Sequence, residues 1–456
     1  MLVSFSIENF RSFSTEQTFS LVASGRLGGT HDSHTVAIPD SDQKVLKVGV
    51  LYGANGAGKS SLFKALKYMR TMVLRAGKTR GTLREPYRFS RVREEPSTFD
   101  LQFISSGSLY RYGFKVDDKY ILEEWLIKVV GNKEVVIFER ATDESGVVTI
   151  DPAGLRKEEK TYLLAKIGGP ANQTFLATAN ATIKDSDLAG HVEKVLYWFK
   201  ANLRMTEPDE NIEPVGHMLA EDASFREFAG EFLKSSSTGV QSLGVEKTEI
   251  TEQDLEKIIP KAILPKILRE LGDSEDGVGI VQMADGQELL LERTDSNRFY
   301  KLSVHSTHRV EDQNYSQLPL REESDGTRRL LQLLPALHVA RSKGATYVID
   351  EIDRSMHPML IWKFLETFLT ACNEKESQII VTTHESNLLD LELLRRDEIW
   401  FAEKDSALST NLYSLSDFKV RKDLEVRKHY LQGRFGAVPF LGRLDGLIES
   451  SETKCH

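Results

Sequence analysis

The chain has 456 residues, of which 40% are hydrophobic and 28% are charged, a globular composition with room for two or three domains. Its 59 basic and 68 acidic residues give a formal net charge of −9, so the chain as a whole does not attract nucleic acid or an anionic membrane. Its two cysteines, Cys372 and Cys455, are too few for a disulfide framework or a thiolate metal site. The start, MLVSFSIENF, lacks the basic region of a signal peptide, and LLQLLPALHVA is shorter than a transmembrane helix. We therefore expect a cytoplasmic protein with no membrane contact.

The first part of the chain is expected to form strands around one glycine-rich loop. Residues 1–22 alternate apolar and polar side chains, which predicts an antiparallel strand pair. The continuous apolar run over 45–52 indicates a strand that is buried on both faces. After the loop, 60–75 has apolar residues at helical spacing, and 99–150 breaks into short alternating runs that predict a β-meander.

In the rest of the chain, the expected secondary structure changes from helix to strand and back to helix. Helical periodicity dominates from about 160 to 270, strands return over 278–304, and a helix is expected over 327–341. Buried strands follow at ATYVID and QIIVTT, and a last strand at EIWFAE. The chain thus divides into three expected parts: 1–160, a mostly helical lobe over 161–275, and 276–456.

The loop after the first buried strand carries the strongest motif. Residues 53–60, GANGAGKS, match G-x-x-x-x-G-K-[ST] in full, between a predicted strand and a predicted helix. The glycines let backbone N–H groups converge on phosphate oxygens, and the helix N-terminus adds positive potential. An ordinary glycine turn before a helix is the alternative, but Lys59 and Ser60 suit the β- and γ-phosphates of ATP and Mg²⁺. The expected nucleotide contacts are Asn55, Gly56, Ala57, Gly58, Lys59, Ser60 and Ser61.

Two acidic residues, Asp350 and Glu351, follow directly after the apolar run ATYVI. In a P-loop enzyme the first, Asp350, is expected to ligate Mg²⁺, and the second, Glu351, to polarise the attacking water. An acidic helix cap after a strand is the alternative. A phosphate-binding loop in the same chain favours the catalytic interpretation.

Further along, the strand QIIVTT ends at His384. The carboxyl ends of the strands in an open α/β sheet are where ligands bind. A histidine alone is more often structural, but after the two preceding motifs we expect His384 to contact the γ-phosphate.

A fourth segment, SDGTRRLL, opens the predicted helix over 327–341. Ser324 and the backbone of Gly326 present hydrogen-bond donors at a helix N-terminus, which is a second anion site. The local alternative is an ordinary N-cap. The segment resembles a variant of the ABC signature, which contacts the γ-phosphate of the nucleotide held by the partner subunit.

Taken in order, these motifs resemble those of ABC-type ATPases of the RecF, RecN and SMC kind. The whole chain is similar to the AAA-fifteen and AAA-twenty-one ATPase families of bacterial anti-phage systems, which include OLD, RloA, PtuA and AriA proteins. The similarity also covers MLVSFSIENFRSF, YRYGFKV, FLKSSSTGV, DEIWFAEKD, SLSDFKVRKD and YLQGRFGAVPFL. It implies an α/β P-loop NTPase of ABC/SMC-head type, with an antiparallel β subdomain and an inserted, mostly helical lobe. The head halves would be 1–160 and 276–456.

The resemblance assigns further roles, and the chain departs from it in places. Arg11 in NFRSF matches an arginine near the nucleotide in RecF-like ATPases. Residues 355–357 fall at the D-loop, with His357 in place of the usual Asp, as in OLD-like proteins. Asp325 stands where most ABC signatures have Gly, and no Q-loop glutamine can be placed, since Gln102 is expected to face outward. About 70 residues after His384 are too few for the Toprim nuclease of OLD proteins, so a nuclease or toxin would be a separate effector.

Two basic regions leave nucleic-acid binding open. The first holds Arg70, Arg75, Lys78, Arg80, Arg84, Arg88, Arg91 and Arg93, and the second holds Lys419, Arg421, Lys422, Arg427, Lys428 and Arg434. Acidic residues interleave in both regions, as on solvated helix faces. Phosphate contacts need clustering in space, which a sequence does not show.

The sequence therefore predicts an ATP-hydrolysing head that uses Mg²⁺ and forms a homodimer or higher homo-oligomer around nucleotide. Its expected role is that of sensor or regulator in antiviral defence or abortive infection, controlling a separately encoded effector. Two alternatives stay open: a RecF-like repair ATPase that acts directly on DNA, and a scaffold that binds ATP with little turnover. DNA-dependent turnover would favour the first alternative, and nucleotide retained on purification would favour the second.

Overall fold

The computed structural model describes residues 1–29, 31–77, 81–208, 215–259, 264–265, 267–268, 278–282, 288–293, 299–310, 314–342, 344–371, 376–419 and 425–438. Both cysteines lie outside these ranges, as do four residues of the two basic regions, Lys78, Arg80, Arg421 and Lys422. The chain forms two compact units, one of Met1 with Ala201–Ile380 and one of Leu2–Lys200 with Val381–His456. Within the described ranges, no helix has the length and apolar character to cross a membrane.

The second of these units contains a seven-stranded antiparallel sheet in the order β10-β9-β8-β7-β6-β1-β2. Its strands are β1 (Leu2–Glu8), β2 (Gln17–Ser20), β6 (Ser97–Ser105), β7 (Ser108–Val116), β8 (Ile121–Val130), β9 (Lys133–Thr142) and β10 (Val148–Asp151). Alternate residues of β6 are buried, among them Phe99, Leu101 and Phe103, because successive side chains of a strand face opposite sides. The predicted strand pair and β-meander are confirmed.

The same unit holds the glycine loop between a strand and a helix. Strand β5 (Val48–Tyr52) is buried at every residue and leads through the loop into helix α1 (Lys59–Leu74). Strand β19 (Ile399–Lys404) pairs in parallel with β5, and β20 (Thr410–Ser414) returns antiparallel to β19. This strand–loop–helix order with a parallel neighbour is that of a P-loop NTPase, so the predicted α/β fold class is confirmed.

The C-terminal end of helix α1 is held in place by a series of contacts that begins at the buried carboxylate of Glu124. Glu124 accepts hydrogen bonds from the hydroxyl of Tyr112 in β7 (3.0 Å) and from the backbone N–H of Phe175 (2.6 Å), the first residue of helix α3 (Phe175–Thr182). Burial raises the pKa of Glu124, and the nearby Arg140 guanidinium opposes that rise. Asn180 of α3 donates to the carbonyl of Leu74 at the end of α1. The sheet therefore fixes α3, and α3 fixes α1.

Two more helices and a C-terminal segment complete this unit. The helices are α2 (Lys160–Ile167) and α4 (Gly190–Tyr197), and the C-terminal segment contains α11 (Val426–Leu431). Tyr430 and Phe435 stack on Phe401 of β19, and the Tyr413 hydroxyl donates to the carbonyl of Phe435. Aromatic packing thus anchors the C-terminal segment to β19 and β20.

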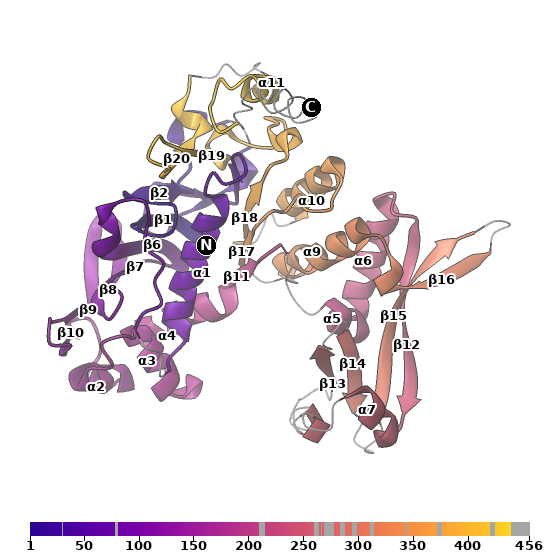
Figure 1. Ribbon diagram of the computed structural model, residues 1–456, viewed down its shortest axis with the longest axis horizontal. Coiled ribbons are helices and arrows are strands. Elements are labelled where there is room, and N and C mark those ends of the chain that lie inside the picture. Colours follow the sequence, from indigo (N-terminus) through magenta and orange to yellow (C-terminus); the bar gives the residue numbers. More distant parts are fainter. Residues whose placement is uncertain are drawn as a thin grey trace, which may run out of the picture. The chain divides into compact units, whose positions relative to one another are not determined.

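The first unit contains a second antiparallel sheet and several helices (Figure 1). Its helices are α5 (Val215–Glu221), α6 (Ala223–Ser235), α7 (Glu252–Ile258), α9 (Asp325–Ser342) and α10 (Pro358–Ala371). The sheet has the order β12-β15-β14-β13, with β16 also paired to β15. These strands are β12 (Val240–Ile250), β13 (Val278–Gln282), β14 (Glu288–Arg293), β15 (Phe299–Arg309) and β16 (Tyr315–Pro319).

Short buried strands carry the acidic and histidine motifs. Strand β17 (Thr346–Ile349) pairs in parallel with β11 (Leu203–Thr206), and all four residues of β17 are buried. Strand β18 (Gln378–Thr383) is buried throughout and runs from the last residues of one unit into the other. The buried strands predicted at ATYVID, QIIVTT and EIWFAE are all present.

The range expected to be helical contains one long strand. Helices α2 to α7 fall within 160–270, but so does β12, which pairs along its length with β15. That partner lies beyond the expected lobe boundary at residue 275. A strand stabilised by a partner about 60 residues away leaves little trace in local periodicity, since cross-strand pairs supply its stability. In addition, α2 to α4 belong to the unit of the seven-stranded sheet.

Candidate nucleotide-binding site

The loop over 53–58 has the backbone of a phosphate cradle. Gly56 and Gly58 have φ of +77° and +109°, in the left-handed region that favours glycine. Helix α1 begins at Lys59, and Gly58 caps it without any side-chain hydrogen bond. The positive end of the helix therefore meets the loop with no capping side chain, as in sites that bind phosphate.

The other predicted contacts are spread along this loop and the first turn of α1. Asn55 and Gly56 are exposed, Ala57 is buried, and Ser60 and Ser61 are half-buried. Exposed glycine and asparagine at the tip with a buried alanine below are the arrangement expected of a loop that closes over a ligand. All of these residues lie within one unit.

Lys59 and His384 meet although 325 residues separate them. The Lys59 ammonium donates to the carbonyls of Gly53 (2.8 Å) and Ala54 (3.2 Å) and lies 3.2 Å from Nδ1 of His384. Since an ammonium only donates, Nδ1 is the unprotonated nitrogen, which leaves the ring proton on Nε2. Lys59 is 5% exposed, whereas His384 is exposed. The structure therefore brings two predicted phosphate contacts together at the end of β18.

Arg11 belongs to a turn beside the loop. It has φ of +50°, its backbone N–H donates to the carbonyl of Glu85, and its guanidinium is 3.2 Å from the Glu85 carboxylate. The next residue, Ser12, has its hydroxyl oxygen 2.7 Å from where a Cβ on Gly58 would stand. The turn over 9–14 thus lies against the P-loop, with Arg11 engaged by Glu85.

The two acidic residues lie in the other unit, at the end of β17. Asp350 is 3% exposed, and its backbone N–H donates to the carbonyl of Thr206 in β11. Glu351 is half-buried with φ of +49°. A left-handed non-glycine residue costs about 1–3 kcal/mol, a strain that is common at functional sites. The predicted catalytic base therefore occupies a strained turn.

The signature segment starts helix α9. The Ser324 hydroxyl accepts from the backbone N–H of Thr327 at 3.1 Å and lies 2.8 Å from the Thr327 hydroxyl, so the N-cap considered as the alternative is present. A Cβ on Gly326 would stand 2.9 Å from the carbonyl oxygen of Ser355. The signature and the D-loop segment of one chain therefore touch at a position that only glycine fits easily.

One group at the signature has no counterpart among the predicted residues. Glu323 is 8% exposed, accepts from the hydroxyl of Ser306, and lies 2.6 Å from Nε2 of His308. Ser306 is fully buried, and serine and glutamate contact the same ring nitrogen, so the three do not form a nucleophilic triad, in which they contact opposite nitrogens. The group ties the signature turn to β15. This group could not be found from the sequence, because Ser306 and His308 form only an S-x-H pattern within a strand, which is not a recognised motif.

His357 and Gln102 take local roles. Nδ1 of His357 accepts from the backbone N–H of Met359 at 3.2 Å, at the start of α10. Gln102 is half-buried on β6, between buried neighbours, as the alternation of that strand predicts. The His357 ring therefore serves the start of its own helix.

The described residues of the first basic region are held in different ways. Arg84 is buried, is 2.7 Å from Asp118, and donates to the carbonyls of Arg93 and Glu95. Arg70 donates to the carbonyl of Phe199. Four arginines of the first region are exposed: Arg75, Arg88, Arg91 and Arg93.

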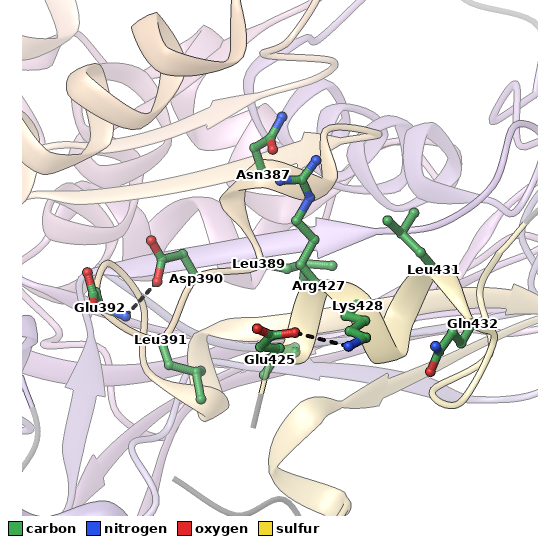
Figure 2. Close-up of a pocket in the computed structure, with 11 residues that line it drawn as sticks. Asn387, Leu389, Asp390, Leu391, Glu392, Glu425, Arg427, Lys428, Leu431 and Gln432 are labelled. Carbon is green, nitrogen blue, oxygen red and sulfur yellow. Dashed lines mark hydrogen bonds and ion pairs between the residues drawn. The ribbon is translucent and has the colours of Figure 1, made fainter. Parts of the chain in front are cut away.

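In the second region, a groove of about 890 Å³ separates α11 from residues 387–392 (Figure 2). Arg427 and Lys428 line it together with Asp390, Glu392 and Glu425, and Lys428 pairs with Glu425 at 3.6 Å. The charges of the groove are therefore mixed, which does not favour a polyanion.

The family match follows the same residues. A model of the family described as "AAA domain, putative AbiEii toxin, Type IV TA system" matches residues 49–153 and 208–390, which include the P-loop, the signature, Asp350, Glu351 and His384. The chain belongs to this AAA-domain family. The predicted AAA-type ATPase family is thereby confirmed, and the family implies nucleotide binding. No curated protein matches the chain.

Solved structures of SMC heads are similar at low identity. The SMC head domain from Thermotoga maritima is 12% identical, covers 91% of this chain and 98% of its own, and has a TM-score of 0.38. An SmcHead bound to the C-winged helix domain of ScpA has the same identity and TM-score, with 91% and 97% covered. A head with an extended coiled coil, bound to the C-terminal domain of ScpA derived from Pyrococcus furiosus, has 12% identity, a TM-score of 0.34, and 91% and 96% covered.

Proposed function

We propose that this AAA-domain protein binds and hydrolyses ATP as the nucleotide-dependent regulator of an anti-phage defence complex, of the OLD, RloA, PtuA and AriA kind. The observation that carries the ATPase proposal is the contact between Lys59 and His384 beside a complete P-loop. It supports a site built for the β- and γ-phosphates, because the Lys59 cation and the His384 ring lie together beyond the end of β18. The family description names a toxin of a Type IV toxin–antitoxin system, which supports a defence setting.

The residues present suit MgATP. The left-handed glycines shape a backbone cradle, and the hydroxyl of Ser60 and the carboxylate of Asp350 are oxygen ligands of the kind that Mg²⁺ prefers. When bound, Mg²⁺ would neutralise charge on the phosphates. Lys59 would hold the β- and γ-phosphates, Nε2 of His384 would donate to the γ-phosphate, and the Glu351 carboxylate would orient the attacking water.

The proposal includes a second subunit. Ser324 and Gly326 lie at the N-terminus of helix α9, where a hydroxyl and a backbone N–H can donate, and we assign them to the γ-phosphate of nucleotide held by a partner copy, as in the ABC signature. Hydrolysis would then require a homodimer or a larger homo-oligomer in the cytoplasm. The effector, a nuclease or toxin, would be a separate protein whose activity follows the nucleotide state.

The test is steady-state ATPase activity of the purified protein with Mg²⁺, with Glu351→Gln as the variant and the exposed Glu425→Gln as its matched control. We expect Glu351→Gln to bind ATP and to lose about 10²-fold or more of the turnover, and to accumulate as a nucleotide-bound dimer in light scattering. Wild-type turnover in Glu351→Gln would contradict the assigned base, and turnover that appears only with DNA would favour the RecF-like alternative. Co-purification from native expression, followed by nuclease and tRNA-cleavage assays, tests for the effector.

A further inference from the structure

We propose that Thr410, 350 residues beyond the P-loop, is a positioning residue for the nucleotide phosphates, and that it acts with Ser12 by fixing one peptide plane of the P-loop. The inference rests on the proposed ATP site. It concerns residues of β20 and of the N-terminal turn that belong to none of the nucleotide-binding motifs.

A relay of two hydroxyls ends on the P-loop. Oγ1 of Thr410 is 2.8 Å from the carbonyl oxygen of Ala57 and 2.8 Å from the hydroxyl of Ser12. The Thr410 hydroxyl is the donor in both contacts, so its one hydrogen is shared between the Ala57 carbonyl and the Ser12 hydroxyl oxygen. The backbone N–H of Thr410 also donates to the carbonyl of Ser12 at 2.8 Å, which fixes the two residues side by side.

The bond to Ala57 sets the direction of the next N–H. In a trans peptide the C=O of Ala57 and the N–H of Gly58 point in opposite directions. Holding the carbonyl toward Thr410 therefore aims the Gly58 N–H away from β20, to the side of the loop open to a ligand. Glycine on one side of this peptide gives its plane unusual freedom to rotate. An external hydrogen bond is thus an effective way to fix the plane.

The relay lies in a closely packed interior. Thr410 is fully buried and Ala57 is 4% exposed. A Cβ on Gly58 would stand 2.1 Å from Oγ1 of Thr410, and a Cβ on Gly53 would stand 2.6 Å from the carbonyl oxygen of Ala402 in β19. The hairpin of β19 and β20 therefore holds both ends of the loop at van der Waals distance. Loss of the hydroxyl alone would leave this packing in place.

Two variants of Thr410 test whether the hydroxyl itself is needed. Thr410→Val keeps the shape of the buried side chain and removes the donor, whereas Thr410→Ser keeps the donor. We expect Thr410→Val to weaken the affinity for both ATP and ADP about tenfold, and Thr410→Ser to restore it to within about threefold of wild type. Because the Gly58 N–H contacts phosphate in the ground state and in the transition state, KM should rise with little change in kcat.

The control lies one residue away. The hydroxyl of Ser409 accepts from the backbone N–H and the hydroxyl of Ser14, in the N-terminal turn and not in the P-loop, so Ser409→Ala should leave nucleotide affinity unchanged. The measurements are calorimetric titration with ADP and with ATP in the Glu351→Gln background, together with the melting temperature with and without ADP. A merely structural role for Thr410 would lower the melting temperature without nucleotide and leave the affinity of the folded protein intact.

The outcomes separate this inference from the proposed function. Absence of ATP and ADP binding in wild type overturns the proposed ATP site, and with it the relay. Normal binding in wild type and an unchanged affinity in Thr410→Val overturn the relay alone. If Thr410→Val does not fold, Ser12→Ala tests the outer half of the relay. It should weaken affinity about two- to fivefold, and wild-type affinity in Ser12→Ala would then contradict the proposal.

Discussion

The P-loop and the signature segment are both short turns that open a helix, yet they are held in different ways. The P-loop is held through its backbone, by the Thr410 hydroxyl on the carbonyl of Ala57 and by close packing of β19 and β20 against its glycines. The signature turn is held through side chains, by Glu323 bound to Ser306 and His308 and by Ser324 bound to Thr327. The contacts that hold the P-loop end on its backbone, whereas those that hold the signature turn end on its own side chains.

The difference fits what each segment is proposed to do. A loop that wraps phosphate oxygens needs its N–H groups fixed before binding, because ordering them at that moment costs affinity. A segment that engages the nucleotide of another subunit has to respond to that subunit. Its attachment to β15 through Glu323 and His308 gives it a direct link to the sheet of its own unit. Four experiments test the contrast.

The largest expected effect is a difference in nucleotide affinity between alanine variants of two glycines, Gly58 in the P-loop and Gly326 in the signature. Gly58→Ala would place a Cβ 2.1 Å from the Thr410 hydroxyl at φ of +109°, so we expect nucleotide affinity to fall about 10²-fold or more. Gly326→Ala meets only the carbonyl of Ser355 at 2.9 Å, and should keep ATP binding while turnover falls. The measurements are calorimetric titration with nucleotide and the ATPase rate, made on both variants and on wild type. Equal loss of binding in both variants would remove the contrast.

The second experiment asks whether the two segments act in different subunits. Lys59→Ala should abolish nucleotide binding, whereas Ser324→Arg should bind ATP but fail to associate or hydrolyse. In a mixture of the two, a heterodimer retains one site built from both unmutated halves, so a fraction of the turnover should return. Full turnover in Ser324→Arg alone would show that each subunit hydrolyses independently and that the signature segment is only a capped helix.

The third experiment concerns the ionic attachment of the signature. Glu323→Gln keeps an oxygen acceptor but removes the charge that faces His308, and should lower the free energy of unfolding by about 1–3 kcal/mol. ATP affinity should stay at the wild-type value while turnover falls, since the P-loop is untouched. The neighbouring Glu322→Gln, an exposed residue, is the matched control in thermal unfolding and in turnover. A weakened ATP affinity in Glu323→Gln would mean that the two segments are not held independently.

The same contrast explains what the sequence could predict. The P-loop, the strand before it and the helix after it are encoded within 30 consecutive residues, so the positions of Gly58 and Lys59 could be predicted. His384 followed from its place after a buried strand. The sequence assigns Lys59 and His384 to the same phosphates, since both follow buried strands whose carboxyl ends face ligands in α/β folds, but it does not predict their direct contact.

The supports of the site could not be predicted. Thr410 and Ser12 are common residues in unremarkable positions, and only the approach of β20 to the N-terminal turn gives them a role. Glu323 and His308 likewise meet through the pairing of β15 with β16. Such contacts depend on the position of whole strands, which local periodicity does not encode. For the same reason, β12 lies in a range whose local pattern predicts helix.

The smallest expected effect is acid sensitivity on the signature side. Asp222 caps α6 by accepting from the backbone N–H of Phe225 at 2.9 Å, and its carboxylate is 3.1 Å from His338 of the signature helix α9. The hydrogen bond from Phe225 is the main cause that lowers the pKa of Asp222 below its ordinary 3.8. The stabilisation is therefore present above pH 3.8 and is lost as the pH falls through the lowered value.

At neutral pH, Asp222→Ala should lower the free energy of unfolding by about 1 kcal/mol, the usual cost of losing an N-cap. The difference from wild type should shrink as the pH falls below 3.8, because protonation weakens the cap in wild type. Chemical denaturation from pH 7 to pH 3 measures it, with Asp185→Ala, whose exposed side chain pairs with Lys200, as the control. The P-loop helix has a glycine cap and offers no comparable titrating group. A destabilisation by Asp222→Ala that stays constant across this range would show that the cap's charge contributes nothing, and would leave the side-chain attachment of the signature to Glu323 alone.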